Sequence, residues 1–167
     1  MKFPELKKGG YNRVKNPVIA FNTLINNMYD ITVGYANKDI NADGAPLNVT
    51  LSNNIFYNSS NKTMNIVTSP VRIRTEGNIY FGSKLGLSEN TGFETKDPKL
   101  VKKDDIYIPS DDSSVIGNAK ENFDFVRTNI NGQKRTGIKD SGSFQKSGDP
   151  VINSPLDPSK VGPDWMH

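Results

Sequence analysis

The chain has 167 residues, 34% of them hydrophobic, and a formal net charge of +3. It contains no cysteine, which excludes disulfide bonds and thiolate metal sites. The small positive excess suits an anionic partner, and we expect neither nucleic acid nor a membrane as a partner. Residues 1–10 carry four charged side chains and no apolar core, so they predict no signal peptide and no membrane span.

One alternating pattern occurs three times along the first half of the chain. The copies are Val18-x-Ala20-x-Asn22-x-Leu24, Val49-x-Leu51-x-Asn53-x-Ile55 and Ile73-x-Thr75-x-Gly77-x-Ile79. Each copy predicts a strand with one buried face. The copies are offset by 31 and 24 residues. Repeats of strand and turn at this period, without a helical pattern, predict a solenoid whose coils stack strand upon strand.

Two asparagines, Asn22 and Asn53, fall at equivalent positions of these repeats. At a coil spacing of roughly 4.8 Å, their side chains can hydrogen-bond from coil to coil as a ladder, which is broken at Gly77. Alternatively, these asparagines only tolerate the left-handed backbone of turns. The sequence leaves both interpretations open.

In chain order, we expect three coils over about residues 11–83, with second strands at 30–33 and 64–67. An insertion from Gly34 to Pro46 lengthens the first coil. After Gly82 the pattern gives way to turn-rich sequence with short apolar stretches at 106–108 and 115–116. We therefore expect coils over residues 1–95 and an irregular cap over residues 96–167, which packs on the coils as one structural unit and covers their last open edge.

Several segments, in this order and spacing, resemble the C-terminal part of polysaccharide lyase family six, which includes chondroitinase B and alginate lyases. They are NPVIAFNTLINN, APLNVTLSNNIFY, EGNIYFG, NINGQKR with a later DSGSF, and the closing SPLDPSKVGPDW. The closing motif contains Pro155-Leu156 and Val161-Gly162-Pro163-Asp164-Trp165. The resemblance extends from about residue 11 onward.

The resemblance implies an all-β fold, a right-handed parallel β-helix, and cleavage of an acidic polysaccharide by β-elimination. The proton beside the sugar carboxylate is hardly acidic, so the carboxylate must be neutralised before a base can remove it. In the family, a calcium ion held by Asn and two Glu neutralises it, a Lys acts as base and an Arg as acid. Alginate is the first expected substrate, before chondroitin or dermatan, because of its frequency in the family.

This chain departs from the family because it lacks the motifs that carry the reaction. It has no Lys-Ser-Gly near alternating Glu residues and no Arg-His pair, since its single His is His167. We therefore expect no catalytic residue and no cofactor in this chain, with calcium implied for the complete enzyme. The expected partners are an acidic polysaccharide and a missing N-terminal half, and the complete protein is expected to be secreted or periplasmic.

Aromatic rings and cations are what a groove for an acidic polysaccharide needs. Arg72 and Arg74 alternate with aliphatic residues, so we expect both on one outer face, or alternatively on a solvated face with Glu76 as partner. A similar alternating set precedes the first strand, and two more candidates lie in the insertion. The candidate binding residues are Tyr11, Arg13, Lys15, Tyr35, Lys38, Arg72 and Arg74.

A weak calcium motif lies in the insertion. Asp39, Asn41 and Asp43 precede Gly44 with the spacing that opens a calcium loop. The twelfth position, where such a loop has a bidentate Glu, is Thr50. An ordinary solvated turn is therefore the favoured interpretation.

Other classes of function share these features. A non-catalytic polysaccharide-binding β-helix has the same repeats and cationic side chains but releases no products. A structural module of a split or truncated enzyme, on its own, neither binds the polymer nor releases products.

Overall fold

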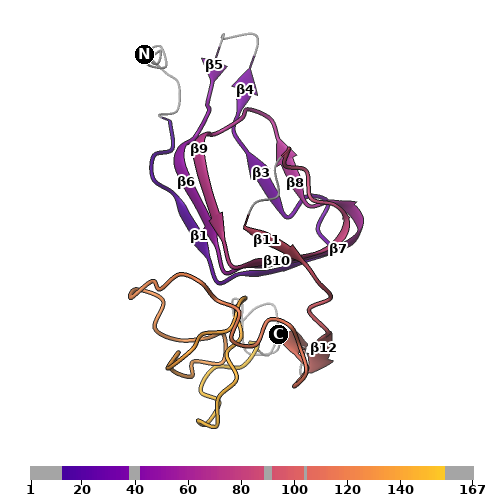
Figure 1. Cartoon of the computed structure of the whole chain (residues 1–167), viewed down its shortest axis with the longest axis vertical. Helices are drawn as coiled ribbons and strands as arrows, with labels where there is room; N and C mark the ends of the chain where they lie inside the picture. The colour runs from indigo at the N-terminus through magenta and orange to yellow at the C-terminus, as the bar shows by residue number, and fades with distance from the viewer. Residues whose placement is uncertain (1–12, 38–41, 89–91, 104, 157–167) are drawn as a thin grey trace, which may run out of the picture.

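The computed structural model describes residues 13–37, 42–88, 92–103 and 105–156, which form thirteen strands and no helix. Among these residues, therefore, no helix is long and apolar enough to cross a membrane. Three sheets of parallel strands build the upper part of the molecule (Figure 1). Their strands are β1 (Val18–Ala20), β6 (Leu47–Ser52) and β9 (Val71–Glu76); β2 (Thr23–Ile25), β7 (Ile55–Lys62), β10 (Asn78–Lys84) and β11 (Phe93–Thr95); and β3 (Ile31–Val33) and β8 (Met64–Ile66).

Each successive coil adds one strand to each of the first two sheets, and the first two coils also add β3 and β8 to the third sheet. The chain passes from β1 through β2 to β3, and then repeats this path from β6 through β7 to β8. This arrangement is a parallel β-helix, so the predicted solenoid is confirmed. The expected second strands are β3 and β8.

The register between the coils corrects one alignment made from the sequence. Val49 pairs with Ile73, as the repeats predict, but Val18 pairs with Thr50 and Ile19 with Leu51. The offset between the first two coils is thus 32 residues, not 31. The alternation failed to fix the register because Val18 and Ile19 are both aliphatic, and either could have faced the core.

An asparagine ladder runs through all three coils. The Nδ2 of Asn22 donates to the Oδ1 of Asn54, and the Nδ2 of Asn54 donates to the Oδ1 of Asn78, each at 3.0 Å. The backbone N–H groups of Asn22 and Asn54 donate to the same two oxygens, at 2.9 and 3.0 Å. The predicted ladder exists, but its second member is Asn54 and it continues past Gly77.

The residue before each ladder asparagine has a left-handed backbone. The φ angles are 57° at Phe21, 56° at Asn53 and 64° at Gly77. Glycine adopts this conformation at no steric cost, and asparagine tolerates it. Both interpretations therefore hold. Asn22, Asn54 and Asn78 form the ladder, whereas Asn53, in the adjacent column, adopts the left-handed backbone.

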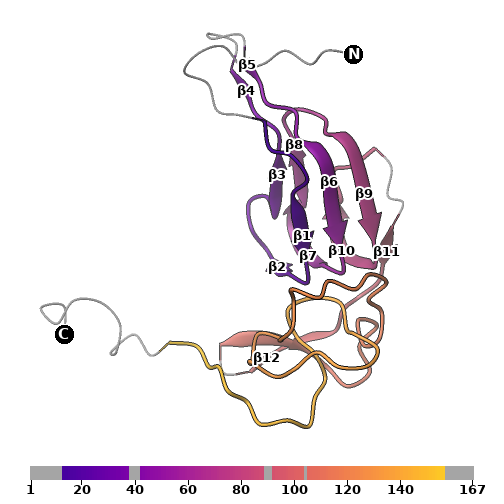
Figure 2. The same ribbon diagram turned by 90° about the vertical axis from the view of Figure 1, so that its left-hand side faces the viewer.

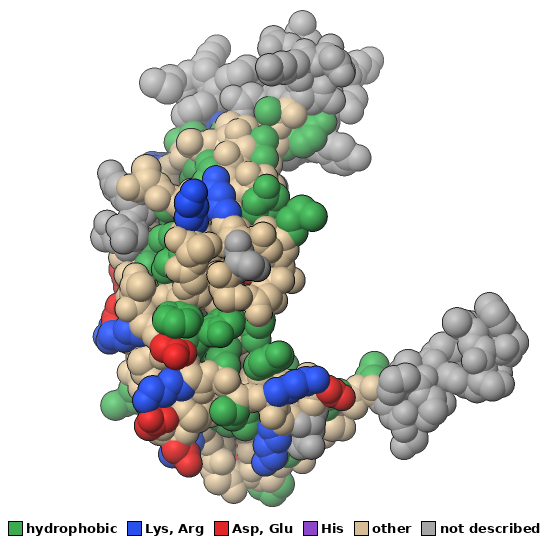
Figure 3. Space-filling view, turned by 90° about the vertical axis from the view of Figure 1, so that its right-hand side faces the viewer, with side chains coloured by type: hydrophobic (Ala, Val, Ile, Leu, Met, Phe, Trp, Pro, Cys, Tyr) green, Lys and Arg blue, Asp and Glu red, His purple; other side chains and the backbone are tan. Residues whose placement is uncertain are grey.

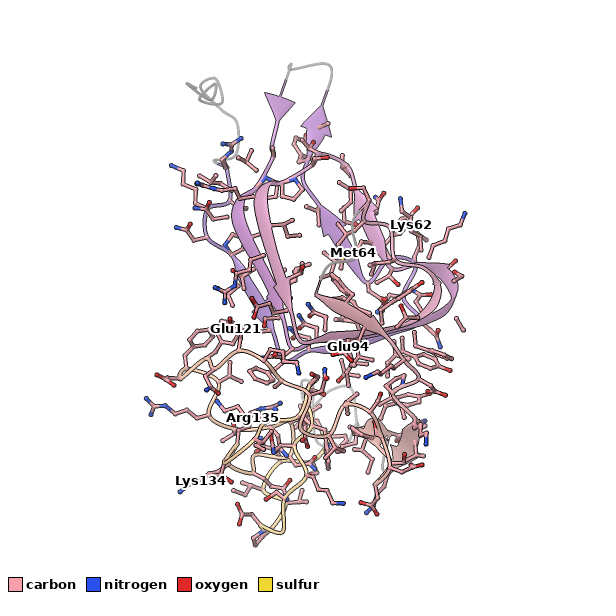
Figure 4. All side chains as sticks on the ribbon, viewed as in Figure 1. Lys62, Met64, Glu94, Glu121, Lys134 and Arg135 are labelled. Carbon is pink, nitrogen blue, oxygen red and sulfur yellow. The ribbon has the colours of Figure 1, made fainter. Side chains whose placement is uncertain are left out.

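The core fills the interior of the coils with stacked side chains. Phe56 is fully buried in it, as is Met64, which Figure 4 labels. Phe56 of β7 packs on Phe93 of β11, two strands away in the same sheet, with ring centroids 5.8 Å apart. The buried cluster comprises Val49, Leu51, Phe56, Met64, Tyr80, Leu85 and Phe93.

The insertion between β3 and β6 forms a separate hairpin. Its strands β4 (Ala36–Asn37) and β5 (Ala42–Asp43) pair in an antiparallel manner, with Ala36 opposite Asp43. The hairpin projects from the coils on the side opposite the C-terminal region (Figure 2). The predicted insertion is therefore a projection that leaves the coil register intact.

After β11 the chain leaves the coil path. An antiparallel hairpin of β12 (Leu100–Lys103) and β13 (Ile106–Pro109) is followed by irregular backbone, and we call residues 96–156 the cap. The cap lies along one flank of the coils (Figure 2). Its described residues contact the first, second and third coils. Lys120 of the cap also lines a hollow beside Gly92 and Phe93 of β11, and the expectation that the cap covers the last open edge stays a prediction.

Three consecutive cap residues make these contacts, one coil each. The Oγ of Ser141 donates to the carbonyl of Gly77 at 2.8 Å, and the N–H of Gly142 donates to the carbonyl of Asn53 at 2.7 Å. The N–H of Ser143 donates to the Oγ1 of Thr23 at 3.0 Å. We call residues 141–143 the strap, because they cross the coils in a direction that joins all three.

One buried cation, Arg135, holds the strap in place. Its guanidinium donates to the carbonyls of Gly142 at 2.7 Å and Phe144 at 3.2 Å, and its Cζ lies 4.4 Å from the ring centroid of Phe21. Burial lowers the pKa of Arg135 to about 10, while the charge of Asp140 raises it, so the side chain is protonated at neutral pH. The NINGQKR and DSGSF motifs therefore have a structural role in docking the cap.

Candidate functional site

The structure places five of the seven candidate binding residues. Arg13, Lys15, Arg72 and Arg74 lie on or beside the sheet β1–β6–β9, whereas Tyr35 lies in the insertion. The sheet therefore brings four of the candidates together and separates Tyr35 from them. Tyr11 and Lys38 are outside the described residues.

Arg72 occupies a column that asparagine occupies in the two preceding coils. Asn16, Asn48 and Arg72 all have left-handed backbones, with φ angles of 53°, 54° and 65°. The Nδ2 of Asn48 donates to the Oδ1 of Asn16 at 2.8 Å. Strict alternation does not continue across a left-handed residue, so the expected common face of Arg72 and Arg74 does not follow from their spacing.

Arg74 is held by the cap. Its guanidinium forms an ion pair with the carboxylate of Glu121, which lies where the cap meets the coils (Figure 4). The alternative partner considered from the sequence was Glu76, and the structure places Glu121 in that role. Arg74 thus has its charge compensated, which makes it a weaker candidate for binding an anion.

Tyr35 marks the base of the hairpin insertion. Its carbonyl accepts hydrogen bonds from the N–H of Gly44 at 2.7 Å and the Oγ1 of Thr68 at 3.1 Å. Its side chain is 47% exposed. These hydrogen bonds fix the backbone of Tyr35, and therefore the position of its aromatic side chain beside the coils.

Two lysines that the sequence did not single out lie on another sheet of the coils, which contains β7 and β10. Lys62 and Lys84 are paired in register on β7 and β10, so their Cα atoms stand one coil apart, or roughly 4.8 Å. Both side chains are exposed, and within the described residues neither ammonium group has an ion-pair or hydrogen-bond partner. We call Lys62 and Lys84 the lysine pair.

The lysine pair is a local concentration of positive charge on the coils. Figure 4 shows Lys62 beside β8, pointing away from the coils. On the face seen from that side, one small patch of Lys or Arg side chains stands among mostly neutral and hydrophobic side chains of the coils, whereas positive and negative side chains alternate over the cap (Figure 3). Like charges directly opposite on neighbouring strands repel each other. An anion that contacts both ammonium groups relieves this repulsion.

Two aromatic rings precede the lysine pair on the same strands. Tyr57 and Phe81 have ring centroids 5.7 Å apart. Their neighbours Phe56 and Tyr80 belong to the inner core, so the alternation of the strand places Tyr57 and Phe81 on the outer face. The same two strands therefore carry outward aromatic and cationic side chains in sequence.

A bulge explains why the lysine pair is not apparent from the sequence. Lys84 pairs with Lys62, which is 22 residues earlier, although the preceding pairs of the same two coils, such as Ile55 with Ile79, are 24 residues apart. The register shifts between Gly82 and Lys84. The only available signal was the similarity of the strand ends YNSSNK and FGSK, each of which closes with Lys.

The described residues contain no cluster of acidic side chains that could hold calcium. Among them, no three acidic, His or Cys side chains cluster as metal ligands. Glu94 is paired with Lys96, whose hydrogen bond and charge hold the pKa of this carboxyl below its ordinary value, and Glu121 is paired with Arg74. For the weak calcium motif, Asp39 and Asn41 lie outside the described residues, and only the backbone of Asp43 is described, in β5.

Comparisons with known proteins agree with this fold. The family model described as Chondroitinase B matches residues 1–126. Among solved structures, the chain is similar to one described as "Structure of PL6 family alginate lyase AlyGC", with 19% sequence identity and a TM-score of 0.53. That match covers 88% of this chain and 18% of that chain. No curated protein matches the sequence closely.

The solved structure supports the β-helix fold. Its match covers more of the chain than residues 1–126, so it includes part of the cap. The chain spans about a fifth of the length of that lyase, because the match covers 18% of it.

Proposed function

This chain belongs to the chondroitinase B family, and we propose that it serves a polysaccharide lyase as a binding wall for uronate-containing polysaccharide. In this proposal the β-elimination takes place on coils that precede this chain. The described coils contribute a rigid scaffold and cationic and aromatic contacts to the polymer. The chain alone binds the polymer and does not cleave it.

The observation that carries this proposal is the lysine pair. Two ammonium groups in register, with no anionic partner among the described residues, fit carboxylates on an extended polyanion. Their spacing of roughly one coil, about 4.8 Å, is similar to the length of one sugar residue. The neighbouring rings of Tyr57 and Phe81 offer apolar surface for the C–H face of a sugar.

The chemistry of β-elimination explains what remains to be supplied. A base removes the proton beside the uronate carboxylate only when the charge of that carboxylate is neutralised. Calcium supplies this neutralisation in our proposal for the complete enzyme. The described residues of this chain do not fit a calcium site, so their part is to bind and orient the polymer.

We propose alginate as the first substrate and chondroitin or dermatan as the next. All three carry uronate residues, to which the lysine pair binds by the same charge-assisted contacts. Such polymers are extracellular, which is why we place the complete protein in the periplasm or outside the cell.

An assay of the chain alone tests this function. The chain is incubated with alginate or dermatan sulfate in the presence of calcium, and unsaturated products are followed by ultraviolet absorbance. In parallel, its migration is measured in gels with and without alginate. We expect retardation in the alginate gel and no products, whereas product release by the chain alone contradicts the proposal.

The same assay separates the alternatives. If a complete protein that contains the preceding coils also binds alginate without releasing products, the non-catalytic binding module is favoured. If the chain is not retarded and its addition restores activity to an N-terminal half, its role is structural.

A further inference from the structure

A pocket of about 240 Å³ lies within the cap, away from the lysine pair. It is formed between the β12–β13 hairpin, the loop around residue 131 and the segment 151–155. Its volume is below the ~300 Å³ at which pockets for drug-sized ligands begin, so it suits one small ring or a few water molecules. The side chains that matter here are Lys103, Ile106, Asn131, Gln133, Phe144 and Asn153.

The side-chain amide of Asn131 lacks a protein partner. The residue is only 9% exposed and lines the pocket. Its carbonyl accepts hydrogen bonds from the N–H groups of Ile152 and Asn153, at 2.9 and 3.0 Å, but within the described residues its side chain makes none. This amide opens toward the pocket, so its donors and its acceptor remain available to water or to a ligand that can both donate and accept.

The neighbouring Gln133 shows the opposite behaviour. Its Oε1 accepts from the Nδ2 of Asn129 at 2.9 Å, and its Nε2 donates to the carbonyl of Asp149. Both ends of this amide are therefore used by the cap itself. Of these two amides, therefore, only that of Asn131 has no hydrogen-bond partner among the described residues.

Phe144 gives the pocket an apolar wall at a fixed place. Its carbonyl accepts from the guanidinium of Arg135 at 3.2 Å, which anchors the backbone at this point. Ile106 adds aliphatic surface from β13. A pyranose ring matches such a lining, because it has one C–H face and a rim of hydroxyl groups.

Lys103 gives the pocket a positive charge. Its neighbour Lys102 forms an ion pair with Asp105 at 2.8 Å, and successive residues of a strand point to opposite faces. Within the described part of the chain, Lys103 pairs with no carboxylate. A ligand with a carboxylate on its ring therefore complements the pocket better than a neutral sugar.

We propose that this pocket is a second saccharide subsite, which binds one uronate residue of an acidic oligosaccharide. Phe144 packs against the C–H face of the ring, Asn131 hydrogen-bonds to its hydroxyl groups, and Lys103 binds its carboxylate. The choice of a uronate rests on the proposed function, whereas the ring-sized pocket, with its mostly apolar lining, stands on the geometry alone.

Titration of the chain with an alginate trisaccharide tests this subsite. Affinity is measured by calorimetry, and the side-chain amide of Asn131 is followed by NMR, with its resonances assigned by their loss in Asn131→Asp. We expect these resonances to shift on binding. Asn131→Ala and Lys103→Gln should each weaken binding by about tenfold, as the loss of one good polar contact does.

Lys102→Gln is the matched control, since it removes the same charge from the opposite face of β12. It should leave the affinity unchanged, and equal thermal unfolding midpoints show that the variants are folded. The subsite is overturned if the Asn131 resonances do not move, or if Asn131→Ala and Lys103→Gln both bind as the parent does.

The subsite and the proposed function can fail separately. If the pocket variants bind the trisaccharide normally while loss of the lysine pair weakens binding of the polymer, the subsite is wrong and the proposed function stands. If the pocket variants lose the trisaccharide while loss of the lysine pair has no effect on the polymer, the binding wall on the coils is wrong and the subsite stands.

Discussion

The coils and the cap are stabilised in different ways. In the coils the same contacts recur, since each ladder asparagine repeats the hydrogen bonds of the one before it. In the cap the backbone is irregular, and its docking combines the strap, one buried guanidinium, the packing of Val115 on Ile55 and Ile79, and hydrogen bonds of the Asn53 amide. We infer that stability is distributed over the coils but concentrated in a few residues of the cap.

Removal of the buried cation should have the largest effect. Arg135→Met leaves the carbonyls of Gly142 and Phe144 without donors, and we expect a loss of about 3–5 kcal/mol in the stability of the cap. Hydrogen exchange should accelerate over residues 117–145 before it does in the coils. Arg127→Met is the control, because Arg127 is exposed and, among the described residues, its guanidinium donates only to the nearby carbonyl of Asp124. If Arg135→Met and Arg127→Met lower the stability of the cap equally, its stability is not concentrated at Arg135.

Interruption of the ladder should come next. Asn54→Ala removes a fully buried amide that bonds to both neighbouring coils, and we expect a loss of about 2–4 kcal/mol in urea unfolding. Asn22→Ala changes the exposed end of the ladder and should cost about 1 kcal/mol. If both variants lower the free energy of unfolding equally, the inner ladder position stabilises the coils no more than the exposed end does.

A small side chain on the strap should have a moderate effect. Gly142 has a φ of 86°, and a Cβ there overlaps the Cδ1 of Ile55, so Gly142→Ala should cost about 1–3 kcal/mol in thermal unfolding. Gly148→Ala lies in the same cap with nothing within 4 Å of its Cβ, and should be nearly neutral. A neutral Gly142→Ala argues against close contact between the strap and the coils.

The surface ion pair between the coils and the cap should have the smallest effect. The side chain of Arg74 is 55% exposed, so Glu121→Gln should cost about 0.2–1 kcal/mol. The difference from the parent should shrink in high salt, because salt screens exposed charges. A loss as large as that of Arg135→Met shows that this pair, and not Arg135, docks the cap.

The sequence predicted the coils better than the cap because their signals differ in range. Alternation and turn residues are local, and they located β3 and β8 directly. The register was wrong by one residue where Val18 and Ile19 offered two aliphatic faces. Contacts of the strap, such as Ser143 with Thr23, join residues 120 apart, and no local pattern encodes them.

The candidate site was harder to predict than the fold. Arg72 and Arg74 were chosen for their spacing, but a left-handed φ at Arg72 and an ion pair at Arg74 follow from tertiary structure. The lysine pair depends on a shift in register that the repeat length hides. Binding residues on a solenoid are therefore found by stacking the coils, and not by reading one strand at a time.

The most direct test of the binding wall is electrophoresis in gels that contain alginate. Migration is compared between the parent chain, Lys62→Gln/Lys84→Gln, and Lys96→Gln/Lys99→Gln. The last variant removes the same charge from lysines already paired with Glu94 and Asp112. We predict that alginate retards the parent and this control, and that loss of the lysine pair strongly reduces the retardation. Equal retardation of all three proteins contradicts binding through the lysine pair.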